Sequence, residues 1–118
     1  MAPPQLIFGT ATFGMDMTEF QDPSSVRAIL DTVQELGIRR LDTGARYPPR
    51  NPGRSEELIG EAKSHGSFTV DTKVYTDVQT NGSGDLTQEA VEASINASLK
   101  RLQRSEGVSK RTIWARIH

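Results

Sequence analysis

Short apolar runs alternate with longer amphipathic segments along the chain. Leu6–Phe8 is an apolar run closed by Gly9 and a Gly/Thr-rich loop, which is typical of a buried strand followed by a turn. Similar short strands are expected at Ile38–Asp42 and at Phe68–Val74, and β-branched and aromatic residues concentrate in the second of these two segments. Their starts, at residues 6, 38 and 68, are 32 and 30 residues apart. This spacing predicts consecutive βαβ units and a parallel sheet.

Helical periodicity fills the intervals between these strands. Asp22 is a predicted N-cap with Pro23 at the first helical position, and apolar residues then recur at helical spacing up to Gly37: Val26, Ile29, Leu30, Val33 and Leu36. A second helix is expected from about Ser55 to Lys63, with an apolar face of Leu58, Ile59 and Ala62. Asp85 or Thr87 can cap a third helix, whose apolar face is Val91, Ile95, Leu99 and Leu102. The sequence therefore predicts three strand-helix units.

Composition narrows the class of protein without identifying a fold. The chain has 118 residues, 35% hydrophobic and 25% charged, and a net charge of -1, which fits one soluble domain and suggests neither nucleic acid nor membrane as a partner. It has no cysteine, so disulfides, thiolate metal sites and cysteine nucleophiles are excluded, and no metal site is expected. The first residues resemble no signal peptide, so a cytoplasmic location is expected. Spacing alone leaves a doubly wound sheet and a β/α barrel open.

Three polar residues are placed where parallel β/α folds collect reactive groups. Asp42 ends the second strand, Tyr47 lies in the loop after it, and Lys73 is near the end of the third strand. A phenol is a poor proton donor at neutral pH, because its unperturbed pKa is about 10, and a neighbouring ammonium lowers that pKa. Such a group suits proton delivery to a carbonyl while a nicotinamide supplies hydride. The plainer alternatives are a turn cap, a surface-packed tyrosine and a solvated lysine.

Longer motifs carry a resemblance to a known family. These motifs are FGTATFG at residues 8–14, GIRRLDTGARY at 37–47, SEELIG at 55–60, TK at 72–73 and SLKRL at 98–102. In this order and spacing they resemble the opening part of an aldo-keto reductase, nearest to the fungal aflatoxin-aldehyde-reductase-like branch. The resemblance covers residues 6 to about 103.

The resemblance implies a fold, a reaction and a set of residues. The fold would be a TIM-type β/α barrel, the reaction an NADPH-dependent reduction of a small aldehyde or ketone, and the setting fungal secondary metabolism. Asp42, Tyr47 and Lys73 match three of the family's four catalytic residues, with Tyr47 as proton donor. Gly9, Thr10 and Asp42 match positions that border the nicotinamide ribose.

The family pattern is lost after about residue 103. We therefore divide the chain into residues 1–103, an incomplete barrel of three strand-helix units, and residues 104–118, a divergent tail. His118 could be the fourth catalytic residue if 112–117 formed a strand, but its spacing from Leu102 is too long for the family, and His65 is expected to be a solvated loop residue. A full barrel needs eight strands and roughly 250 residues.

The incomplete barrel has consequences for activity and association. Strands one and three would be open edges, which favours self-association, and the sites for the NADPH adenine and 2′-phosphate would be missing. We therefore expect an oxidoreductase by descent that is truncated and weak or inactive. The alternatives are a non-enzymatic chain that pairs with another protein and a small flavodoxin-like binding module.

Overall fold

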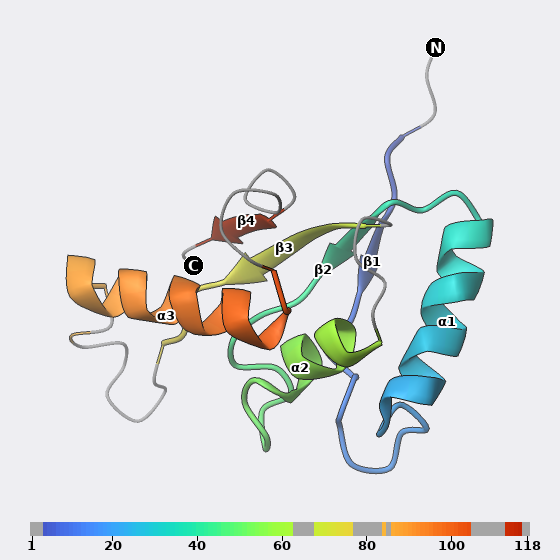
Figure 1. Ribbon diagram of the computed structural model, residues 1–118, viewed down its shortest axis with the longest axis horizontal. Coiled ribbons are helices and arrows are strands. Elements are labelled where there is room, and N and C mark those ends of the chain that lie inside the picture. The colour runs from blue at the N-terminus through green and yellow to red at the C-terminus, as the bar shows by residue number, and fades with distance from the viewer. Residues whose placement is uncertain (1–3, 63–67, 77–83, 85, 105–112, 117–118) are drawn as a thin grey trace.

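A computed structural model describes residues 4–62, 68–76, 84, 86–104 and 113–116. Strands and helices alternate along the chain (Figure 1). The strands are β1 (Ile7–Gly9), β2 (Arg40–Asp42), β3 (Thr69–Lys73) and β4 (Ile113–Arg116). The helices are α1 (Pro23–Glu35), α2 (Arg54–Glu61) and α3 (Gln88–Arg101). The three predicted strand-helix units are confirmed, and β1, β2 and β3 each lie within or overlap their predicted ranges.

The strands form one parallel sheet in the order β1-β2-β3-β4. A doubly wound sheet reverses its strand order part-way, whereas a β/α barrel adds each strand beside the previous one. The unbroken order here, with α1, α2 and α3 following one another across the molecule (Figure 1), is that of an incomplete TIM-type barrel.

Two expectations about the sheet were wrong. We expected three strands with β3 as an open edge, but β4 from the tail pairs with β3 in parallel, Val70 opposite Ile113. We also expected Leu6–Phe8 to be buried, but Leu6 is 61% and Ile7 49% exposed. β1 pairs only with β2 among the described residues, so one side of β1 has no neighbouring strand to cover it. His65, Asp85 and His118 lie outside the described residues.

The helices begin at the caps that the sequence predicts. The carboxylate of Asp22 accepts a hydrogen bond from Ser25 N at 2.8 Å, and the hydroxyl of Thr87 accepts one from Ala90 N at 3.2 Å. Each cap satisfies an amide that the first turn leaves without a helical partner. Leu36 is 72% exposed, contrary to prediction, because it is the residue at which α1 ends.

The core lies between the sheet and the helices. Leu41 of β2 and Val70 of β3 are completely buried there. The other core residues are Phe13, Val26, Leu30, Val33, Leu58, Ile59, Ala62, Phe68 and Leu102. α3 contributes least, since Ser98 is its only buried residue and Leu102 follows its last turn. Among the described residues, no helix is both long and apolar enough to cross a membrane.

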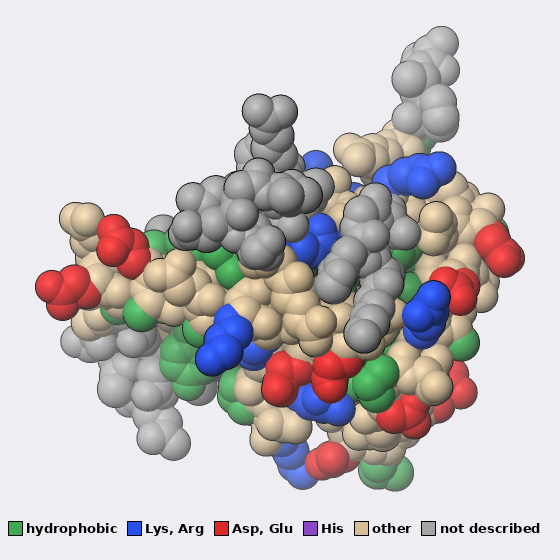
Figure 2. Space-filling model, viewed as in Figure 1, with side chains coloured by type: hydrophobic (Ala, Val, Ile, Leu, Met, Phe, Trp, Pro, Cys, Tyr) green, Lys and Arg blue, Asp and Glu red, His purple; other side chains and the backbone are tan. Residues whose placement is uncertain are grey.

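The visible surface has no single dominant charge. Figure 2 shows basic and acidic side chains interspersed over the helices on this face. This mixture agrees with the net charge of -1, and the described residues on this face form no extended basic region for a phosphate backbone.

Candidate active site

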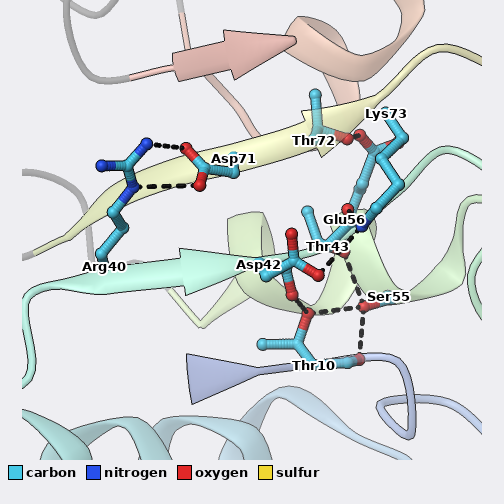
Figure 3. Close-up of polar contacts among 9 residues, drawn as sticks. All are labelled: Thr10, Arg40, Asp42, Thr43, Ser55, Glu56, Asp71, Thr72 and Lys73. Carbon is cyan, nitrogen blue, oxygen red and sulfur yellow. Dashed lines mark hydrogen bonds and ion pairs between the residues drawn. The ribbon is translucent and has the colours of Figure 1, made fainter. Parts of the chain in front are cut away.

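The carboxyl ends of β2 and β3 bring Asp42 and Lys73 together, as predicted. The ammonium Nζ of Lys73 lies 2.9 Å from Oδ2 of Asp42 and donates a second hydrogen bond, also 2.9 Å, to the carbonyl oxygen of Thr43 (Figure 3). Lys73 is 13% and Asp42 26% exposed, so the pair is shielded but still reaches solvent. The carboxylate and the carbonyl together fix the position of the ammonium.

Tyr47 joins this pair from the loop between β2 and α2. Nζ of Lys73 lies 4.7 Å from the centroid of the Tyr47 ring, within the range of a cation–π contact. The ring packs closely on the backbone of Gly44, because a Cβ placed there would lie 3.3 Å from two ring carbons. The structure therefore brings all three predicted catalytic residues together.

A cavity of about 220 Å³ opens beside these groups. Its lining residues come from the loop after β2 and from the end of β3: Gly44, Arg46, Tyr47, Pro49, Lys73 and Val74. The guanidinium of Arg46 spans the two loops, with Nη1 3.4 Å from the hydroxyl of Thr76. The cavity thus combines a phenol, two cations and apolar surface.

The two other predicted cofactor residues lie at the end of β1. Gly9 is the register partner of Asp42, and a Cβ built on Gly9 would meet no atom within 4 Å, so the space beside it is open. Thr10 is completely buried, and its hydroxyl donates to the carbonyl oxygen of Asp42 at 2.8 Å. The Thr10 side chain therefore supports the strand ends, and the cofactor roles of both residues stay predictions.

Hydroxyl groups connect these strand ends to the start of α2. Oγ of Ser55 lies 3.2 Å from Oγ1 of Thr10 and 3.0 Å from Oγ1 of Thr43, and it donates to the carbonyl oxygen of Thr10 at 2.8 Å (Figure 3). All three side chains are completely buried. This network holds β1, β2 and α2 in fixed relation around Asp42.

A second ion pair lies two residues earlier on the same two strands. Nε and Nη2 of Arg40 donate to Oδ2 and Oδ1 of Asp71, each at 2.9 Å (Figure 3). The hydrogen bond to the Asp71 carboxylate raises the pKa of Arg40. Neither Arg40 nor Asp71 was among the residues that the sequence predicted to be functional. The opposite charges at alternate positions of the two strands, Arg40 with Asp42 and Asp71 with Lys73, were a signal that could have revealed this pair.

Glu56 is the other polar residue that the sequence analysis missed. It is completely buried on α2, where Oε2 accepts a 2.6 Å hydrogen bond from Thr72 and Oε1 lies 2.8 Å from Nη2 of Arg101. The close approach of α3 to α2 depends on Gly60, because a Cβ there would lie 2.3 Å from the carbonyl oxygen of Arg101. Glu56 therefore ties β3 and α3 to α2 on the side of the sheet away from Lys73.

Comparison with known proteins assigns the chain to a family. The model of the aldo/keto reductase family matches residues 5–107. None of the curated proteins compared with the chain matches it. Among solved structures, an aldo-keto reductase from Bacillus halodurans in its holo form is 30% identical with a TM-score of 0.63. A Pseudomonas aeruginosa protein assigned to the aldo-keto reductases is 26% identical with a TM-score of 0.66.

These similarities cover most of this chain but only part of each relative. The alignments span 85% of this chain in both cases, but 32% of the Bacillus protein and 37% of the Pseudomonas protein. An aldo-keto reductase from Klebsiella pneumoniae in complex with NADPH shares the fold at 23% identity and a TM-score of 0.65, over 86% of this chain and 32% of its own. Because the family model matches most of its length, this chain belongs to the aldo/keto reductase family.

Proposed function

We propose that the chain is an NADPH-dependent oxidoreductase that reduces an aldehyde or ketone to an alcohol. The position of Lys73 carries the proposal. Its ammonium lies between the carboxylate of Asp42 and the ring of Tyr47, at the edge of an open cavity. Such a cluster of a phenol and a fixed cation suits proton donation to a carbonyl oxygen. Family membership supports the same reaction.

The described residues fit the nicotinamide end of NADPH. Gly9 leaves open space at the strand ends, in register with Asp42 and so beside the Lys73 ammonium. Gly9, Thr10 and Asp42 would border the nicotinamide ribose, and the NADPH complex of the Klebsiella relative supports this cofactor. When bound, the nicotinamide supplies hydride to the carbonyl carbon.

The side chains of the site have separate roles in the proposed reaction. The Tyr47 hydroxyl donates its proton to the carbonyl oxygen of the substrate. The Lys73 ammonium stabilises the negative charge that develops on the phenol oxygen as the proton leaves. Asp42 and the carbonyl oxygen of Thr43 keep the ammonium in place, which removes the need for it to reorganise during the reaction.

Steady-state oxidation of NADPH with a panel of aldehydes tests this proposal. We expect turnover that Tyr47→Phe reduces by roughly 100- to 10,000-fold, as for loss of a general acid. Tyr75→Phe is the matched control, because Tyr75 is exposed and does not line the cavity. Absence of turnover in the parent chain, or equal turnover in Tyr47→Phe, contradicts the proposal.

Finer assignments rest on the sequence resemblance. Motifs at residues 8–14 and 37–47 support membership of the aflatoxin-aldehyde-reductase-like branch, and with it a cytoplasmic role in fungal secondary metabolism. We also propose that residues 1–103 are the family-like part and that 104–118 diverge from it. Comparison of each segment with sequences of that branch is the direct check.

Self-association through the β1 edge is a further part of the proposal. Leu6 and Ile7 are exposed beside a strand that has one partner among the described residues. An exposed apolar edge strand favours pairing with another chain. Sedimentation should therefore show concentration-dependent association that Leu6→Lys with Ile7→Lys suppresses. A parent chain that stays monomeric at all concentrations contradicts this proposal.

A further inference from the structure

Ser55 attaches the start of α2 to the strand ends of the candidate active site. Its side chain is completely buried, although serine is mostly an exposed residue type. Its backbone N–H donates to the carbonyl oxygen of Tyr47 at 3.1 Å, and its hydroxyl contacts Thr10 and Thr43 (Figure 3). One residue of α2 therefore contacts the segments that follow both β1 and β2.

The direction of these hydrogen bonds follows from the number of protons available. A serine or threonine hydroxyl has one proton to donate. The Thr10 hydroxyl donates to the carbonyl oxygen of Asp42, and the Ser55 hydroxyl donates to the carbonyl oxygen of Thr10, each at 2.8 Å. The 3.0 Å hydrogen bond between Ser55 and Thr43 must therefore use the proton of Thr43. Ser55 both accepts from Thr43 and donates to Thr10, and a side chain without a hydroxyl can do neither.

Thr43 connects Ser55 to the groups proposed to react. It follows the last residue of β2, and its carbonyl oxygen accepts a 2.9 Å hydrogen bond from the Lys73 ammonium. The hydroxyl of the same residue is held by Ser55. Because the ammonium lies 4.7 Å from the centroid of the Tyr47 ring, a rotation of the Thr43 peptide would move the cation relative to the phenol.

We propose that Ser55 is a positioning residue, whose hydroxyl sets the Lys73 ammonium against the Tyr47 ring by fixing Thr43. This inference rests on the proposed function and adds a residue to it. Ser55 is completely buried and does not line the cavity, so it has no exposed surface for substrate or cofactor. Its loss should therefore lower kcat and leave KM nearly unchanged.

Steady-state kinetics test this separation of kcat from KM. Ser55→Ala should lower kcat about 10- to 100-fold, as small misplacements of reacting groups do. The KM for the aldehyde and the Kd of NADPH should change less than about threefold. Ser98→Ala is the matched control, because Ser98 is also a buried helical serine but lies on α3, where its hydroxyl accepts from Arg101 at 3.3 Å. Equal losses of kcat in the two variants, or a change in KM alone in Ser55→Ala, overturn the inference.

Two substitutions of Thr43 test the connection to Lys73. Thr43→Ser keeps the hydroxyl and should retain kcat within about threefold, whereas Thr43→Val keeps the shape and should lose about as much as Ser55→Ala. The double variant Ser55→Ala with Thr43→Val should lose little more than either single variant, because both remove the same hydrogen bond. Fully additive losses, or equal kcat in Thr43→Ser and Thr43→Val, overturn the inference.

Tyrosine NMR decides the inference even if no aldehyde is turned over, a result that contradicts the proposed function separately. The chain has two tyrosines, so ring-labelled tyrosine gives two sets of signals, and Tyr75→Phe identifies those of Tyr47. Lys73→Met removes the cation and defines the direction in which its loss shifts the Tyr47 signals. Ser55→Ala should shift them in the same direction by a smaller amount, and the control should not. Thr43→Val should give the same shift, which keeps the test decisive if Ser55→Ala does not fold. Unchanged Tyr47 signals in these folded variants overturn the inference.

Discussion

Two neighbouring residues of β3 contact carboxylates on opposite faces of the sheet. Lys73 pairs with Asp42 beside the cavity, and Thr72 donates to Glu56 beneath α2 (Figure 3). Asp42 is 26% exposed, whereas Glu56 is completely buried and also binds Arg101. An exposed pair stabilises a fold little, while breaking a buried pair is costly. The comparison teaches that similar carboxylate contacts have different surroundings: the one beside the cavity belongs to the proposed active site, and the buried one holds β3, α2 and α3 together.

The largest expected effect is on the rate of the proposed carbonyl reduction, when Lys73 beside the cavity is replaced. Lys73→Met should lower kcat/KM for carbonyl reduction by roughly 100- to 10,000-fold, because the charge that assists proton release from Tyr47 is lost. Its free energy of unfolding should change by no more than about 1 kcal/mol, since the ion pair is partly exposed. Steady-state kinetics and urea denaturation measure the two quantities. Lys100→Met, at an exposed position of α3, is the control for loss of a lysine.

On the buried face of the sheet, the expected effect is on stability. Glu56→Ala leaves Thr72 and Arg101 without their acceptor and should lower the free energy of unfolding by about 3–5 kcal/mol. The urea midpoint measures this loss. Glu56→Gln keeps an acceptor and should cost less. An unchanged midpoint in Glu56→Ala would show that the buried pair is not a source of cohesion.

Gly60 tests how the buried pair is assembled. A Cβ at this position would overlap the backbone at the end of α3, which flexible side chains cannot relieve. Gly60→Ala should therefore lower the free energy of unfolding by about 1–3 kcal/mol, as overpacking does. Gly9→Ala is the control in the same denaturation series, because a Cβ at Gly9 would meet no atom within 4 Å and Gly9 has no positive φ. An equal free energy of unfolding in Gly60→Ala and the parent chain would contradict the close approach of α3 to α2 at Gly60.

The smallest effect is expected at Thr72. Thr72→Val keeps the shape of the side chain but removes the hydroxyl that donates to Glu56 at 2.6 Å. The free energy of unfolding should fall by about 1–2 kcal/mol, because Arg101 still neutralises the carboxylate. Thermal denaturation with Thr69→Val as the strand control measures it. A loss equal to that of Glu56→Ala would mean that Thr72, not Arg101, is the main partner.

Local signals in the sequence predicted the elements, and the expectation of a parallel sheet predicted that residues at neighbouring strand ends lie close together. The Asp22–Pro23 cap identified α1, and parallel strand ends were enough to place Asp42 near Lys73. Burial of Leu6 and Ile7 was wrongly predicted because it depends on what lies beside β1, which no local pattern contains. Glu56 was missed because its partners are 16 and 45 residues away, and a helical glutamate is usually solvated.

The alternation along β3 also constrains how the chain can fold. A slip of one residue in the pairing of β2 with β3 would turn Lys73 toward the buried side of α2 and Thr72 toward the cavity. Asp71 would at the same time leave Arg40 and enter the apolar core beside Leu41. Each misplaced charge would lose its partner, so the slipped arrangement is strongly disfavoured. The polar residues of β3 thus favour one register of the strand over the others. A single-residue insertion in this strand should therefore lower the free energy of unfolding far more than most substitutions do.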